Sequence, residues 1–311
     1  MTVAVFGSVN LDLTVYVQAL PRPGQTIHAD RQVIGLGGKG ANQAVAAQKL
    51  SATPVRLIAA TGADAFGQTL RTALAENGIA LDHVAVFDDV PSGNALIHVD
   101  ARSQNVITVT GGANMAWPDA GPGAEGFAGV GVALFQLETP LVATLAAMRA
   151  ARAAGATVIL DPAPIPRRDL TDVLAEADVA TPNETEAEAL VGIRPEDPAA
   201  AIAAARALVT RGPRLAIVKM GARGLAYATV QGETGIVPPF AVTAVDTVAA
   251  GDSFNGALAV ALDEGLPVPQ ALRFAAAAGA LATTRFGASA AAPSRAEVER
   301  LIGDQADPGT G

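Results

Sequence analysis

The sequence of 311 residues contains no cysteine. A disulfide framework, a zinc–thiolate site and a thiol nucleophile are therefore excluded. Positive charge is also scarce, because 21 lysines and arginines stand against 30 aspartates and glutamates, which gives a formal net charge of −9. A chain this acidic would repel the phosphates of a nucleic acid and the surface of an anionic membrane. We therefore expect neither nucleic acid nor a membrane as a partner.

Long apolar runs are missing as well. The first residues, MTVAVFGSVNLDL, have no basic region followed by an apolar stretch, so we expect no signal peptide. No segment free of polar residues is long enough to span a bilayer, and a cytoplasmic location follows as the expectation. Aromatic residues make up only 4% of the chain while hydrophobic residues make up 50%. This composition indicates a sizeable core in which helices pack closely through alanine.

Short apolar runs alternate with helical patterns along the chain. Buried parallel strands are indicated at 3–7, 55–60, 130–135, 156–160 and 214–219. Helical spacing separates them, most clearly at 39–50, 65–76, 140–154, 184–191, 197–210, 252–263 and 268–284. This alternation predicts an α/β fold, a three-layer α/β/α sandwich with a mostly parallel central sheet.

Two regions, 12–34 and 92–110, break this alternation. The second contains NALIHVD, a turn at 101–104 and then NVITVT, which is typical of a β-hairpin. We expect the two regions to form a small β-sheet lid on one domain that covers residues 1–302. Residues 303–311 are polar and rich in glycine, and they are expected to form a flexible tail.

The segment VDTVAAGDSFNGAL at 245–258 carries the first chemical signal. The small residues at 249–251 would allow backbone N–H groups to face an anion at a helix N-terminus. Asp252, which follows at once, could accept a proton from a hydroxyl that attacks a bound phosphoryl group. An ordinary aspartate N-cap on an alanine-rich helix is the alternative interpretation of this short segment.

The segment GGKGANQAVAAQKL at 37–50 would bring backbone close to a small ligand, and Asn42 offers donors and an acceptor for hydroxyls. Two of its glycines, Gly37 and Gly40, together with Gly35 before it satisfy G-x-G-x-x-G. A dinucleotide site is therefore a formal competitor. The strand before it is polar and belongs to the lid region, which disfavours that competitor. A Walker A motif is excluded, because Lys39 is followed by glycine.

Three further segments carry polar residues where sites are expected. Asn10 and Asp12 leave the first strand at its carboxyl end, where ligand crevices lie, although an Asx-turn would also explain them. Glu138 follows the strand at 130–135 in the same way. Asn183 and Glu186 have the spacing of an N-cap and a capping box.

Together these segments resemble the ribokinase-like (PfkB) family of carbohydrate kinases, from about residue 3 to residue 302. The resemblance implies ATP-dependent phosphorylation of the primary hydroxyl of a sugar, with D-ribose as the first expectation. It implies that Asp252 is the general base and that Ala249, Ala250 and Gly251 form the anion hole with it. The sugar would be bound by Asn10, Asp12, Gly38, Lys39, Gly40, Ala41, Asn42, Glu138 and Asp252.

The same resemblance implies sites for the cofactors. ATP would be held by Asn183, Lys219, Met220, Gly221, Ala222, Arg223, Gly224, Gly251 and Ala276. Mg²⁺ would be ordered by Glu186 through water. K⁺ would be held by Asp246, Val248, Ala282, Arg285 and Gly287. Lys219 stands where threonine is commoner, and Ala291 stands where serine is common.

The resemblance also implies a homodimer joined through the lids, because exposed sheet edges favour pairing. Two other functions stay open. A related kinase could act on deoxyribose, a ketohexose or adenosine, and Asn94 and His98 in the lid are unusual enough to keep that open. A non-catalytic sugar-binding regulator is the other possibility, which the intact Asp252 disfavours.

Overall fold

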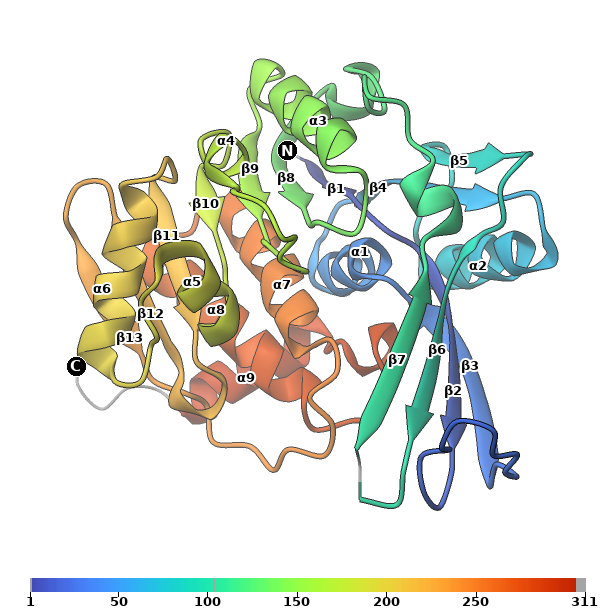
Figure 1. Cartoon of the computed structure of the whole chain (residues 1–311). Helices are drawn as coiled ribbons and strands as arrows, with labels where there is room; N and C mark the ends of the chain where they lie inside the picture. The colour runs from blue at the N-terminus through green and yellow to red at the C-terminus, as the bar shows by residue number, and fades with distance from the viewer. Residues whose placement is uncertain (1, 103, 306–311) are drawn as a thin grey trace.

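The computed structural model describes residues 2–102 and 104–305. Its main body is a central sheet covered by helices (Figure 1). The strands of this sheet are β1 (Thr2–Phe6), β4 (Arg56–Gly62), β5 (Val84–Phe87), β8 (Val130–Phe135), β9 (Thr157–Leu160), β10 (Val179–Ala180), β11 (Leu215–Lys219), β12 (Leu225–Thr229) and β13 (Thr234–Val237). The helices are α1 (Lys39–Leu50), α2 (Ala65–Glu76), α3 (Leu141–Ala153), α4 (Thr171–Leu174), α5 (Glu184–Val191), α6 (Pro198–Val209), α7 (Ala250–Asp263), α8 (Val268–Ala282) and α9 (Arg295–Asp304).

The strand order is β13-β12-β11-β10-β9-β8-β1-β4-β5. Neighbours from β5 to β11 are parallel, and β12 and β13 extend the sheet as an antiparallel hairpin. The predicted three-layer sandwich with a mostly parallel sheet is confirmed.

Different helices cover the two faces of the sheet. Side chains alternate along the strands, so Val3 and Val5 pack in one core with α1, α2, α7, α8 and α9, whereas Ala4 and Phe6 pack in another core with α3 to α6. Small residues allow close approach between helices. A Cβ on Gly256 of α7 would lie only 2.7 Å from the carbonyl oxygen of Gln43 of α1. Helices α1 and α7 therefore meet at backbone contact distance.

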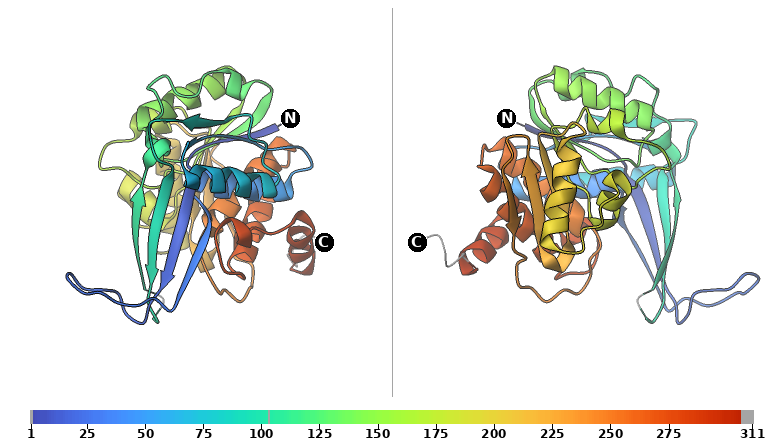
Figure 2. Two further views of the ribbon diagram at one scale, coloured as in Figure 1. Left: turned by 90° about the vertical axis from the view of Figure 1, so that its right-hand side faces the viewer. Right: turned by 60° about the vertical axis from the view of Figure 1, so that its left-hand side comes forward.

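The lid is a second sheet that projects from the main body (Figures 1 and 2). Its strands are β2 (Asn10–Tyr16), β3 (Arg31–Gly37), β6 (Gly93–Val99) and β7 (Asn105–Thr110), in the order β3-β2-β6-β7. The small lid is confirmed; β2 begins and β3 ends beyond the predicted range 12–34, whereas β6 and β7 lie within the predicted range 92–110. The predicted turn at 101–104 includes residue 103, which lies outside the described residues.

The C-terminal end differs from the prediction of a flexible tail at 303–311. Helix α9 includes Gly303 and Asp304. The side chain of Gln305 accepts from the backbone N–H of Ala241 at 2.9 Å and donates to its carbonyl at 3.0 Å. Residues 306–311 lie outside the described residues. Within residues 2–102 and 104–305, no helix is long and apolar enough to cross a membrane.

Candidate active site

The winding of the sheet reverses at β1, which lies between β4 and β8. Ligands bind beyond the carboxyl ends of the strands at such a point in open α/β sheets. The segments that follow β1 and β8 are in contact there. The Ser8 hydroxyl donates to Glu138 Oε2, and a Cβ on Gly7 would lie 2.0 Å from Gln136 Oε1. The predicted site residues gather around this contact.

Asp252 lies in the first turn of α7, and its carboxylate faces α1. Its Oδ2 accepts from Asn42 Nδ2 at 3.1 Å, and its Oδ1 accepts from Gln43 Nε2 at 3.0 Å. Burial raises the pKa of Asp252 above its usual value; the ammonium of Lys39 opposes this shift, and the carboxylate of Asp161 adds to it. A carboxylate with a raised pKa is a stronger base, which suits Asp252 to accept a proton.

The segment before Asp252 has the backbone shape of an anion site. Ala249 is the N-cap of α7 at φ 56° and ψ 15°, and no other non-glycine residue that the structure describes has a positive φ. This left-handed conformation is strained for alanine, and such strain is concentrated at functional sites. Ala250 and Gly251 follow in the first helical turn, where backbone N–H groups lack partners within a helix. Their role as an anion hole stays a prediction.

The glycine-rich segment before α1 lies against the chain that leaves β1. Gly38 adopts a φ of 87°, and a Cβ on Gly40 would lie 2.5 Å from the carbonyl carbon of Gly7. Ala41 N–H donates to the Ser8 carbonyl at 2.9 Å. Lys39 N–H donates to Glu138 Oε2 at 3.0 Å. Glu138 thus fastens both loops, and its predicted contact with the sugar stays a prediction.

Lys39 is the electrostatic centre of the predicted sugar site. Burial would lower the pKa of its ammonium, but the carboxylates of Asp252, Asp161, Glu138 and Glu186 together raise it above the usual value. Lys39 is therefore held in its charged form beside the candidate base.

The two lid residues expected to bind hydroxyls lie at the start of β2. Asn10 is buried, and its Oδ1 accepts from Asn114 Nδ2 at 2.8 Å. Asp12 pairs with Gly35 of β3, and its carboxylate lies over Gly37, where a Cβ would collide with it. Burial, followed by the charge of Glu138, raises the pKa of Asp12 to about 7. Asp12 therefore changes charge near neutral pH.

Asn94 and His98 were expected to bear on sugar choice, but the register places them on the other face of the lid. Within β6 they pair with Leu11 and Val15 of β2, whereas Asp12 pairs with Ala95. Successive side chains of a strand point to opposite faces. Asn94 and His98 therefore cannot reach a sugar that lies against Asp12.

The predicted Mg²⁺ and nucleotide segments lie at the ends of β10 and β11. Asn183 caps α5 and forms a capping box with Glu186, whose Oε2 accepts from the Asn183 backbone N–H at 2.8 Å. The capping-box interpretation is confirmed, and it leaves room for the metal role. Burial, with the charge of Asp161, raises the pKa of Glu186, and Lys219 lowers it.

The turn at 219–224 only partly suits its predicted role. Gly221 and Gly224 have φ of 54° and 83°, as expected for a tight turn. Met220 is buried in the core, so its side chain cannot reach a nucleotide. Arg223 is turned toward α5, where it pairs with Glu184 and donates to the Pro195 carbonyl at 2.7 Å. Ala222 is exposed on the same turn.

Helix α8 carries the last of the predicted nucleotide residues. Ala276 is half-buried, one turn before Gly279. A Cβ on Gly279 would lie 3.2 Å from the carbonyl oxygen of Ala250. Ala276 is therefore close along the helix to the N-terminus of α7.

The residues predicted to hold K⁺ lie on two loops that meet. Asp246 Oδ1 accepts from Val248 N–H at 3.0 Å, and its Oδ2 accepts from Gly287 N–H at 3.2 Å. Arg285 N–H donates to the Ala282 carbonyl at 3.4 Å. Asp246 thus ties together the segments that carry the other four residues.

Several site residues were not predicted from the sequence. Ser8 and Asn114 hold the sugar-site loops, and Gln43, Gln136 and Asp161 form a buried chain behind Asp252. Asp161 follows a buried strand at its carboxyl end, which is a usable signal. A glutamine within an alanine-rich helix gives no such signal.

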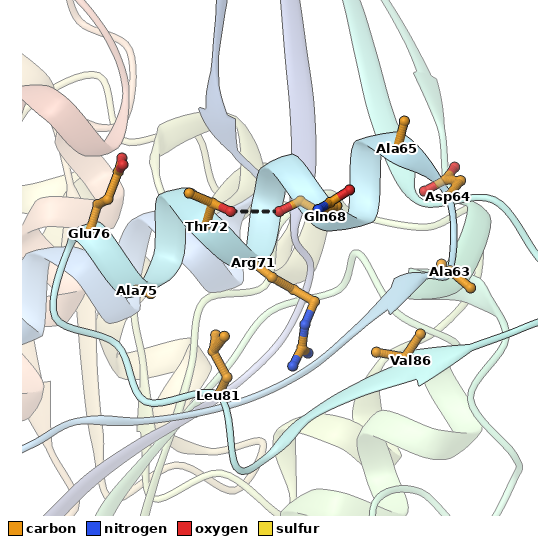
Figure 3. A pocket seen from close by; sticks show the side chains of 11 residues that line it. Ala63, Asp64, Ala65, Gln68, Arg71, Thr72, Ala75, Glu76, Leu81 and Val86 are labelled. Atoms are coloured by element: carbon orange, nitrogen blue, oxygen red, sulfur yellow. Dashed lines mark hydrogen bonds between the residues drawn. The ribbon is translucent and has the colours of Figure 1, made fainter.

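A groove between α2 and the edge strand β5 lies apart from these residues (Figure 3). Arg71 in this groove donates to the Val84 carbonyl at 2.8 Å, and Thr72 donates to the Gln68 carbonyl at 3.0 Å. The side chains of Arg71 and Thr72 are thus engaged with the backbone around them.

The dinucleotide competitor is contradicted by the fold. Gly35 and Gly37 lie in β3 of the lid, which is antiparallel to β2. The dinucleotide motif requires instead a parallel strand of the main sheet that leads into the helix.

Comparisons with known proteins agree with this geometry. The model of the pfkB family carbohydrate kinases matches residues 1–295. The ribokinase of Haemophilus influenzae is 38% identical over 304 residues, which are 97% of this chain and 98% of that protein. A deoxyribokinase of Salmonella typhimurium is 36% identical over 296 residues, which are 94% of this chain and 96% of that protein. The structure of Arabidopsis thaliana ribokinase complexed with ribose and ATP has a TM-score of 0.89 at 35% identity, covering 97% of this chain and 98% of that one.

Proposed function

Because this chain belongs to the pfkB family of carbohydrate kinases, we propose that it transfers the γ-phosphoryl group of ATP to the primary hydroxyl of D-ribose. The product would be D-ribose 5-phosphate. One observation carries the proposal: the buried carboxylate of Asp252 is fixed by Asn42 and Gln43 at the N-terminus of α7. A base in this place meets both a bound sugar and a bound phosphate.

The reaction follows from this arrangement. Sugar lies between lid and main sheet, with its hydroxyls at Asn10, Asp12, the 38–42 segment and Glu138. The carboxyl group of Asp252 takes the proton of the primary hydroxyl, and the sugar oxygen forms a bond to the γ-phosphorus. The bond from that phosphorus to the β,γ-bridging oxygen breaks, and ADP leaves. The first turn of α7 stabilises the negative charge of the transferring group.

Unsatisfied buried polar atoms support a polar ligand beside Asp252. Among the described residues, Asn42 Oδ1 is buried without a hydrogen-bond partner. Such an atom costs about 1–3 kcal/mol unless a ligand pairs with it. A sugar hydroxyl would supply the donor that it lacks.

The cofactor residues fit Mg²⁺ and K⁺. Both oxygens of Glu186 accept from Asn183, and each keeps a lone pair for a water bound to Mg²⁺. The metal, held by the phosphates, would neutralise their charge. K⁺ would be held where Asp246 joins its two loops, with backbone carbonyls as the other ligands.

The function is tested by measuring ADP release with a panel of pentoses, hexoses and nucleosides. We expect the highest kcat/KM with ribose. A higher value with deoxyribose would favour the second candidate, which the deoxyribokinase relative supports at nearly the same identity. Release of no ADP with any of these compounds would contradict a kinase and favour a sugar-binding regulator.

Sugar affinity is expected to depend on the charge of Asp12. Its pKa of about 7 means that the carboxylate, which accepts bonds from hydroxyls, is lost as the pH falls below 7. KM for ribose should therefore rise between pH 8 and pH 6, approaching about tenfold per pH unit below the pKa. In Asp12→Asn, KM should be high and flat over this range. A wild-type KM that stays constant would contradict the assignment.

K⁺ is expected to raise kcat above its value in Na⁺ at the same ionic strength. An ion beside the anion hole would strengthen its field, and coupling between two sites is usually about fivefold or more. The preference should vanish in Asp246→Ala, because the two loops lose their shared carboxylate. Equal rates in the two salts for the wild type would rule out the cation site.

A homodimer through the lid is supported by its exposed apolar side chains. Val33, Ile107 and Val109 are 43%, 52% and 55% exposed. Their side chains lie on the same face of the lid as the side chain of Asp12. Ile107 of β7 pairs with Ile97 of β6, and Ile97 pairs with Thr14 of β2, which is two residues from Asp12. Light scattering should give twice the chain mass of 31.1 kDa for the wild type and the single mass for Ile107→Lys. A wild type of 31.1 kDa would show the dimer to be wrong.

A further inference from the structure

A buried ion pair lies beside the candidate anion hole. Lys219 Nζ is 3.2 Å from Asp161 Oδ1, and the two side chains are only 16% and 3% exposed. Lys219 ends β11, and Asp161 follows β9, so both lie at the carboxyl edge of the main sheet. Removing two charges from water is costly, and such pairs seldom increase stability over apolar residues. Stability therefore does not explain this buried ion pair, and we looked for a functional role.

The ammonium of Lys219 points at the N-terminus of α7. A Cβ on Gly251 would lie 3.5 Å from Lys219 Nζ, which is van der Waals contact distance. Lys219 Nζ also lies 5.9 Å from the ring centroid of Phe254, one turn further along the same helix. The ammonium is thus in reach of an anion that sits on the first turn of α7.

A single glutamine joins this ion pair to the candidate base. Gln43 Nε2 donates to Asp161 Oδ2 and to Asp252 Oδ1, both at 3.0 Å. The amide has two N–H donors, and each is used by one carboxylate. Its Oε1 accepts from Gln136 Nε2 at 2.6 Å, which fixes the orientation of the amide. Gln43 and Gln136 are fully buried.

We propose that Lys219 is a catalytic cation that contacts the transferring phosphoryl group, and that Asp161 and Gln43 position it relative to Asp252. This inference rests on the proposed kinase function. The ammonium of Lys219 neutralises the charge that develops on the phosphoryl oxygens. Asp161 and Gln43 touch no substrate; they fix the separation between the cation and the base through one hydrogen-bonded unit.

The test compares Lys219→Met, Asp161→Asn and the double variant. Lys219→Met keeps the length of the side chain without its charge, and kcat should fall about 10²–10³-fold, as when one donor to a transition-state anion is removed. Ribose affinity, measured by calorimetry without ATP, should change less than twofold. Asp161→Asn should lower kcat about tenfold or more, and the double variant should be no slower than Lys219→Met, because the two act as a unit.

Asp178→Asn is the matched control. Its carboxylate accepts from Val158 N–H at 2.9 Å at the opposite end of β9. We expect this variant to keep kcat. If Asp161→Asn does not fold, Gln43→Met breaks the same unit from the other side and should also lower kcat with ribose binding retained.

Three outcomes would overturn the inference: a kcat of Lys219→Met near that of the wild type, an effect confined to KM for ATP, or losses that multiply in the double variant. These outcomes are distinct from failure of the proposed function, in which the wild type itself would release no ADP.

Discussion

Asp252→Asn is expected to lower kcat by about 10²–10⁴-fold, the usual contribution of a general base. The amide cannot accept the proton of the sugar hydroxyl. The NH₂ group of the new asparagine would also face an N–H donor, because the two carboxylate oxygens of Asp252 accept hydrogen bonds from Asn42 and Gln43. Ribose binding, measured by calorimetry, should largely persist, since the other hydroxyl-binding residues are unchanged. Steady-state ADP release gives kcat.

Asp64→Asn provides the matched control for this substitution. Asp64 is the N-cap of α2, where its side chain accepts from Gly67 N–H at 2.8 Å. Asparagine is a good N-cap, but it loses the bond that Asp64 Oδ2 accepts from Ser92 N–H at 3.0 Å, so the unfolding free energy should fall by about 1 kcal/mol while kcat stays near that of the wild type. If Asp252→Asn turned over as fast as this control, the role of Asp252 as general base would be wrong; the N-cap of α7 is Ala249, so capping does not explain Asp252 either.

Gly40→Ala is expected to lower both stability and activity. The new Cβ would lie 2.5–2.7 Å from backbone atoms of Gly7 and Ser8, and neither segment can yield by turning a side chain. Overpacking of this kind costs about 1–3 kcal/mol of unfolding free energy. The shift also moves Asn42 relative to Asp252, and a displacement of about 1 Å at a reacting site can cost 10²-fold in rate. Urea denaturation and kcat/KM measure the two effects.

Gly35→Ala is the control for Gly40→Ala, because it replaces a glycine with alanine where no clash is expected. Gly35 belongs to the same glycine-rich segment, but a Cβ there would meet no atom within 4 Å. Its unfolding free energy should stay close to that of the wild type. Equal losses of stability in both variants would contradict the role given to close approach at Gly40.

The sequence pattern predicted most of the main body because its signals are local. The helices at 39–50 and 65–76 were predicted to the residue, since a regular apolar spacing marks them. Strand β10 has only two residues and was missed, because its place depends on pairing with β9 and β11. Helix α9 was missed although Ser294 and Glu297 form a capping box, which was a readable signal.

The candidate site residues could be proposed from the sequence where they lie in one continuous motif, as do Asp252 and the 38–42 segment. The chain from Gln136 through Gln43 to Asp161 was not, because its members are far apart in sequence and meet only when two strands and a helix are assembled. Arg223 was assigned to the nucleotide site by resemblance alone, and its side chain pairs with Glu184 of α5.

The backbone contact between α1 and α7 at Gly256 has a consequence for changes of sugar preference. It holds Asp252 against the helix that carries Asn42 and Gln43. The lid strands contribute Asn10 and Asp12 from a separate sheet. Under the proposed function, exchange of the lid residues Asn10 and Asp12 would therefore change the preferred sugar without disturbing the helix contact that positions Asp252.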